Sequence, residues 1–257
     1  MRPALLLLLL LSWWCAPPAG AAEPLVADLS THYIAITTGF TGKDVVLFGA
    51  TDAPCKQHDA KAGKCDVVVV VRGPNGTAVV RRKSQIAGVW MNTLQVTFTG
   101  VPDYYAVYST RPLDEIMSPA MSALNDIGAN NLRLGVVEKD RTPQQIAEFR
   151  AALLRQQQRD DLFVEAVESF NFLNDSLFHL PLSFPANVPV GNYTVLTLLV
   201  RDKAVVGGQT SPLIISQDGI DAEVNDFADH EALAYGFVAV VAAAMAGWLA
   251  SLPFRHA

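Results

Sequence analysis

The segment CDVVVVVRGPNGTAVVRRK, from Cys65 to Lys83, carries the strongest fold signal in the sequence. Its run of consecutive valines leaves no polar side chain for a solvent face, so it predicts a strand covered on both sides at the centre of a sheet. Asn75 and Gly76 accept positive φ angles, and after Pro74 they predict a tight hairpin turn into the next strand. The stretch therefore predicts a β protein built around a buried strand.

Strand patterns continue on both sides of this stretch. THYIAITTGF and DVVLFGA precede it, and QIAGVWMN, LQVTFTG and YYAVYST follow it. These segments are rich in β-branched and aromatic residues and are separated by turn signals. Short strands at such close spacing predict an immunoglobulin-like β sandwich over residues 23–111.

Residues 112–161 have a helical period instead. LDEIMSPAMSALNDIG predicts a helix that is broken at Pro119. A second helix is expected to start at Pro143, with Thr142 as its cap and Gln145 completing a capping box. Its apolar face consists of Ile146, Phe149 and Leu153. The chain is therefore predicted to be mainly β with a helical insertion.

Strand signals return in residues 162–217. LFVEAVESF, SLFHLPLSF and NYTVLTLLV read as strands, and Gly207 and Gly208 predict a turn. These strands either form a second β unit or complete the first. We expect two β units joined by the helical segment.

The amino end has the layout of a signal peptide. Arg2 precedes an apolar run, and small residues follow, so residues 1–22 are expected to be removed after Ala21 or Ala22. The body of the protein is then exported.

The carboxyl end predicts one membrane anchor. Residues 232–254 carry no charge, and as a helix they reach about 34 Å, enough to cross a hydrocarbon core of about 30 Å. Residues 218–231 form an acidic stalk before this segment, and residues 255–257 form a cytoplasmic tail with Arg255, which fits the positive-inside tendency. The protein is expected in a bacterial inner membrane, with its body in the periplasm.

Small residues recur along the predicted anchor. Ala239, Ala243 and Gly247 are spaced four apart, which lets another helix approach closely. The segment is therefore expected to pack against an integral membrane partner or a second copy, with a plain lipid-embedded anchor as the alternative.

Cys55 and Cys65 are the only cysteines expected in the exported body. A close pair of cysteines in an oxidising compartment predicts a disulfide. The alternative is a metal site of Cys55, His58 and Cys65, with Asp59 or His32 as a fourth ligand.

Charge and motifs exclude several functions. The net charge is −6, so nucleic acid is not an expected partner. The chain lacks a nucleophile elbow, a metalloprotease motif, a Walker loop and a dinucleotide fingerprint, so neither enzyme activity nor a cofactor is expected. Basic residues cluster only where Arg81, Arg82 and Lys83 face Arg72 across the predicted hairpin. This cluster is the candidate contact for an anion or a partner.

Several motifs together resemble an uncharacterised family of alphaproteobacterial transmembrane proteins. They are GKDVVLFGA, DVVVVVRGP, VRRKSQIAGVWMN, YYAVYSTRPL, FPANVPVGNY and the terminal YGF and AGW. The resemblance implies a Gram-negative periplasm, and it implies an accessory role beside a sulfite-exporter-like permease. It implies no catalytic residues.

The leading hypothesis is a periplasmic binding or accessory module that is tethered by one helix and assists a membrane permease. The alternative is a periplasmic enzyme or metal-handling protein that uses Cys55, His58 and Cys65.

Overall fold

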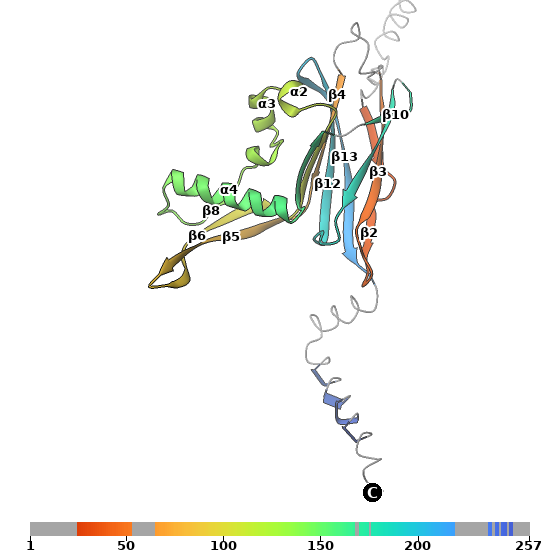
Figure 1. Cartoon of the computed structure of the whole chain (residues 1–257). Coiled ribbons are helices and arrows are strands. Elements are labelled where there is room, and N and C mark those ends of the chain that lie inside the picture. Colours follow the sequence, from red (N-terminus) through yellow and green to blue (C-terminus); the bar gives the residue numbers. More distant parts are fainter. Residues whose placement is uncertain are drawn as a thin grey trace, which may run out of the picture.

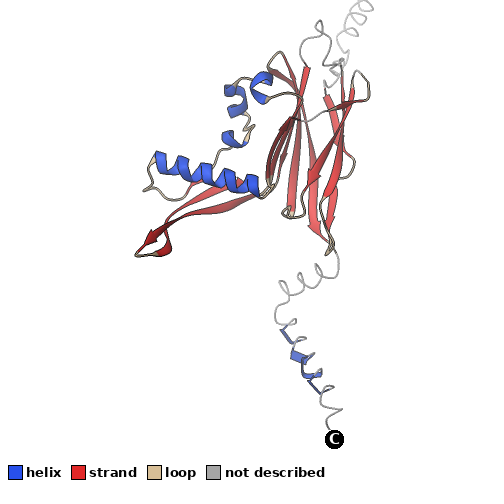
Figure 2. Cartoon of the chain, viewed as in Figure 1, coloured by secondary structure: helices blue, strands red, loops and turns tan. Residues whose placement is uncertain are grey.

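The computed structural model describes residues 25–52, 65–167, 170–174, 176–218 and a set of helical positions between 236 and 248. The described chain is mainly β, with helices inserted between strands, as predicted (Figures 1 and 2). The predicted immunoglobulin-like arrangement of the strands is not confirmed.

Three sheets make up the β part. The first contains, in order, β1 (Leu25–Leu29), β3 (Lys43–Thr51), β11 (Leu177–Phe184) and β10 (Asn171–Phe172). The second contains β2 (Tyr33–Ile36), β13 (Ala204–Gln217), β12 (Gly191–Arg201), β4 (Cys65–Arg72), β7 (Tyr105–Ser109) and β9 (Phe163–Val167). The third contains β5 (Asn75–Ile86), β6 (Val89–Pro102) and β8 (Gly135–Val136). Pairing is antiparallel except at both edges of the second sheet, where β2 and β9 are parallel to their neighbours.

The valine run of β4 is buried on both faces, as predicted. Val67, Val69 and Val71 face a core shared with the first sheet. Val68 and Val70 face a second core, shared with the helices and the third sheet. Because successive side chains of a strand point to opposite faces, one uninterrupted apolar strand serves both cores. Figure 1 shows the first sheet on one side of β4 and the helices on the other.

The two predicted β units share their sheets. β3 pairs with β11, and β4 pairs with β12, so each central strand of the amino-terminal half lies beside a strand from residues 162–217. Neither half would bury its apolar face alone, because the first core takes residues from both. The strand pairing therefore joins the two segments into one sandwich and not into the two units that were expected.

The helices follow the predicted breaks. α2 (Leu113–Ile116) ends before α3 (Pro119–Leu124), which starts at the proline that was expected to interrupt the helix. After the short η1 helix (Ala129–Asn131), α4 (Pro143–Arg159) begins with the predicted capping box of Thr142 and Gln145. Phe149 and Leu153 are buried in the second core, so the predicted apolar face of α4 is confirmed.

The hairpin predicted at Asn75 and Gly76 is wrong. β5 pairs with β6, and the turn between them is Ala87 and Gly88, whose φ angles of 49° and 85° suit a tight hairpin. At Gly73 and Pro74 the chain bends but stays paired with the opposite strand, because the Gly73 amide donates to the carbonyl of Tyr104 at 2.8 Å. β4 and β7 form the base of one long ribbon, and β5 and β6, hereafter the arm, form its outer half (Figure 1).

The turn predicted at Gly207 and Gly208 is also wrong. Both glycines lie inside β13, opposite Leu199 and Leu198 of β12. The chain reverses earlier, through Asp202 and Lys203, which have φ angles of 50° and 67°. At Gly208 an added Cβ would come within 3.0 Å of Leu198, so here glycine permits close packing rather than a turn.

Several predictions fall outside the described residues. They concern the signal peptide, Cys55, His58, the stalk beyond Asp218, Ala239 and most of the predicted anchor. Ala243 and Gly247 are described and are helical. Across the described positions, none of the helices combines the length and the apolar character that crossing a membrane requires.

Candidate functional site: a groove between the arm and the long helix

A groove with a volume of about 470 Å³ lies where α4 crosses the arm. It is lined by Val80, Arg81 and Arg82 from β5 and by Glu148, Phe149, Ala151, Ala152 and Arg155 from α4. The floor is apolar and the rim is charged. Three arginines against one glutamate give the rim an excess of two positive charges.

Arg82 joins the two walls of the groove. Its guanidinium forms an ion pair with Glu148, and its Cζ lies 5.3 Å from the centre of the Phe149 ring. Both charged side chains of this pair are about half exposed, so the pair contributes little to stability. The ion pair places Glu148 beside Arg82, so the charge of Arg82 is neutralised within the groove.

The remaining positive charges of the groove belong to Arg81 and Arg155. Arg81 is exposed, and its Nε donates to Oε1 of Gln95 on the neighbouring strand at 3.4 Å. Arg155 is exposed on α4. Two guanidinium groups above an apolar floor suit an acidic side chain or another anionic group that also brings apolar surface.

The predicted basic cluster is only partly assembled. Arg81 and Arg82 line the groove, and Lys83 is exposed beyond them on β5. Arg72 does not face them, because β4 and β5 do not pair. Sequence reasoning missed Glu148 and Arg155 as parts of the site. Their separation of seven residues places them on one face of α4, but the sequence did not indicate that this helix packs against β5.

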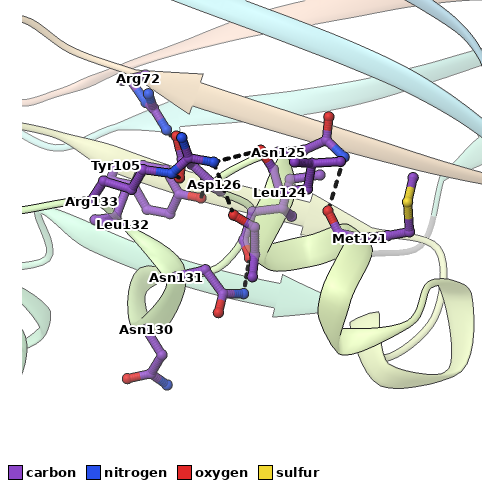
Figure 3. Close-up of polar contacts among 12 residues, drawn as sticks. Arg72, Tyr105, Met121, Leu124, Asn125, Asp126, Asn130, Asn131, Leu132 and Arg133 are labelled. Carbon is purple, nitrogen blue, oxygen red and sulfur yellow. Dashed lines mark hydrogen bonds and ion pairs between the residues drawn. The ribbon is translucent and has the colours of Figure 1, made fainter.

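Arg72 belongs to a second polar cluster, shown in Figure 3. The carbonyl of Asp126 accepts from the Tyr105 hydroxyl at 3.0 Å and from Arg72 at 3.4 Å. The Gly128 amide donates to the Tyr105 oxygen at 2.9 Å, and Nε of Arg133 lies 2.9 Å from the Asp126 carboxylate. The main-chain carbonyls of Met121, Leu124 and Ile127 are further acceptors in this region. Together these bonds hold the loop between α3 and η1 against β7.

Burial raises the pKa of Tyr105 to about 12, from an ordinary value near 10. Arg72 opposes this rise, because its charge favours the phenolate. The neutral phenol is therefore favoured in the fold. The stability that this preference contributes is complete below pH 10 and is lost as the pH rises from about 10 to about 12.

Tyr105→Phe tests that cluster. We expect it to lower the free energy of unfolding at pH 8 by about 1 to 3 kcal/mol, because the buried Gly128 amide loses its acceptor. The loss of stability between pH 10 and 12 should also become smaller than in the unchanged chain. Urea unfolding at pH 8 and pH 11 measures both effects. Tyr33→Phe, at an exposed tyrosine, is the control, and an equal loss in that variant would contradict the assignment.

The predicted cysteine site is described only at one end. Cys65 opens β4 and is disulfide-bonded, whereas Cys55 and His58 lie outside the described residues. Within the described part of the chain, no group of three or more His, Cys, Asp or Glu side chains is placed to hold a metal ion. The pairing of Cys55 with Cys65 stays a prediction, whereas the metal alternative needs Cys65 as a free thiolate and so disagrees with its disulfide-bonded state.

Comparisons with known proteins give a family match. Residues 24–256 match the family described as "Putative transmembrane protein (Alph_Pro_TM)". No curated protein matches the chain. Among solved structures, AggA, the major subunit of aggregative adherence fimbriae type I from Escherichia coli, is similar at 11% identity. The similarity covers 76% of this chain and 97% of AggA, with a TM-score of 0.24.

Proposed function

The chain belongs to the Alph_Pro_TM family, and from this premise we propose that it is a single-pass inner-membrane protein whose β-rich body acts in the periplasm as a binding or accessory module. The body is proposed to bind a partner and to catalyse no reaction. The observation that carries the proposal is the groove between the arm and α4, where Arg81 and Arg155 rim an apolar floor. Such a surface suits recognition, since charge at the rim selects the partner and the apolar floor supplies affinity.

The proposed partner is an integral membrane protein with an acidic segment on its periplasmic side. A permease of the sulfite-exporter-like class, which the sequence resemblance implies, is the specific form of this proposal. The described helical positions Ala243 and Gly247 support a second contact within the bilayer. An added Cβ at Gly247 would meet no described atom within 4 Å, so the described chain leaves that side open to a partner helix or a second copy.

Charge reversal at the groove tests this function. We expect Arg155→Glu to reduce recovery of a stoichiometric membrane partner from solubilised membranes at least about tenfold, because like charges would then face each other across the interface. Affinity purification with quantitative mass spectrometry measures the ratio of partner to protein.

Arg159→Glu is the matched control for that experiment. It makes the same change on the same helix, at an exposed position outside the lining of the groove. Recovery of the unchanged protein alone would overturn the proposed function. An equal loss of partner in both variants would overturn the assignment of the groove.

We also propose that Cys55 and Cys65 form the disulfide, which would close the loop before the central strand β4. Support comes from the disulfide-bonded state of Cys65 and from the exported location proposed above. Closing a loop of this length is expected to stabilise the fold by about 2.5 to 3 kcal/mol. A thiol titration of the denatured mature protein should find no free thiol before reduction and two after it. Two free thiols before reduction, or a bound metal in elemental analysis, would contradict the pairing.

A further inference from the structure

The tip of the arm exposes a group of large apolar side chains. Ile86, Val89, Trp90 and Met91 surround the turn, and each is between 51% and 66% exposed. The turn itself is Ala87 and Gly88, so the tip offers no charged side chain. Apolar side chains gathered at the end of a projecting hairpin lose favourable burial unless something covers them.

The charge of the arm differs from that of the whole chain. Residues 75–102 contain Arg81, Arg82 and Lys83 and no aspartate or glutamate, whereas the chain as a whole carries −6. An arm with an apolar aromatic tip and cations behind it has the pattern of segments that lie in a membrane interface beside anionic headgroups.

The spacing along β5 agrees with the depth of an interface. Lys83 lies four residues before the turn, which is about 13 Å along a strand. Interfacial segments bury their apolar part about 5 to 10 Å into the boundary between headgroups and acyl chains. The lysine would therefore stand at or just above the headgroups while Trp90 and Met91 enter the boundary.

The arm also points in a suitable direction. In Figure 1 its tip and the end of β13 both lie toward the lower end of the described body. Residues 219–231 connect that end to the predicted anchor, and an extended chain covers at most about 3.5 Å per residue, so the bilayer lies within about 45 Å of Asp218. The anchored end of the body and the arm tip can thus face one membrane.

We infer that the arm tip is a second membrane contact, in which Trp90 and its apolar neighbours insert into the interface of the bilayer that holds the anchor, and Lys83 contacts anionic headgroups. This inference rests on the membrane anchoring in the proposed function, and it is independent of partner binding in the groove.

The test places one tryptophan at the tip. The full chain carries tryptophans at 13, 14, 90 and 248, so Trp13→Phe, Trp14→Phe and Trp248→Phe together leave Trp90 alone. The purified full chain is reconstituted into anionic vesicles, with and without brominated acyl chains. Flotation with the vesicles reports anchoring, and quenching of Trp90 by bromine reports insertion of the tip. We expect flotation, a blue-shifted emission and at least about twofold quenching.

Two variants sharpen the result. Moving the tryptophan to the exposed surface of the first sheet, by Trp90→Phe with Phe48→Trp, should abolish quenching. Lys83→Gln should lower the ratio of inserted to free tip about fivefold in anionic vesicles and leave it unchanged in neutral ones. Flotation without quenching of Trp90 would overturn the inference but leave the proposed anchoring intact. The same conclusion holds if a copurified protein shields Trp90 from the bromine. Failure to float would overturn both.

Discussion

Phe98→Ala is expected to lower the free energy of unfolding by about 3 to 5 kcal/mol. The Phe98 ring is 1% exposed and lies in the second core, where the base of the arm meets β4 and the helices. On the ladder it stands between Ala78 of β5 and Val136 of β8, and neither side chain is large enough to fill the space of a lost ring. The variant therefore loses the transfer free energy of the ring and gains a cavity.

Val79→Ala is the matched control for this substitution. Val79 lies on the same arm, next to the partner of Phe98, but it is about half exposed. Its truncation should change the free energy of unfolding by less than about 0.5 kcal/mol. Urea unfolding followed by circular dichroism measures both variants. A loss below about 1 kcal/mol for Phe98→Ala would show that the arm does not share its core with the sandwich.

Arg111→Ala is expected to lower the free energy of unfolding by about 3 kcal/mol, because it leaves a buried carboxylate without its counter-charge. Asp66 follows Cys65 in β4 and is almost fully buried. Arg111 reaches it with two bonds, Nε to Oδ1 at 2.8 Å and Nη2 to Oδ2 at 2.5 Å, and Thr110 adds a hydroxyl at 3.0 Å. These bonds to Asp66 raise the pKa of the Arg111 guanidinium, which agrees with a strong pair.

Two further variants separate the buried pair from its exposed neighbour. Glu115 accepts from Arg111 at 3.1 Å on the solvent side, so Glu115→Gln should cost less than about 1 kcal/mol. Adding Asp66→Asn to Arg111→Ala should recover part of the lost stability, because the unpaired buried charge is removed. Urea unfolding of the single and double variants measures the coupling. If the double variant were less stable than Arg111→Ala alone, the unpaired charge would not be the cause.

The local features of the chain could be predicted from the sequence because each depends on residues a few positions apart. The capping box at Thr142 and the break at Pro119 follow from backbone hydrogen bonding within one turn. The valine run of β4 predicted burial on both faces, because a strand without polar side chains has no face suited to water.

The candidate groove could be predicted only in part. Arg81 and Arg82 were identified as a basic cluster, and the apolar face of α4 was found from its period. The contact of Arg82 with Glu148 joins residues 66 positions apart, and no local rule specifies such a contact. The same limit explains the error at Asn75, where a good turn dipeptide lies at a bend because β5 finds its partner in β6.

Sequence patterns alone predicted most of the strands, the starts of two helices and the burial of β4 on both faces, but they placed one strand across Ala87 and Gly88, where the chain turns. Only the tertiary structure decided that residues 162–217 complete the amino-terminal sheets, that the ribbon bends at Gly73 to form the arm, and that α4 closes a groove on it. The physical reason is that propensity, capping and side-chain period act over a few residues. Strand partners are chosen by which distant apolar faces bury each other best, and that choice depends on the whole chain at once.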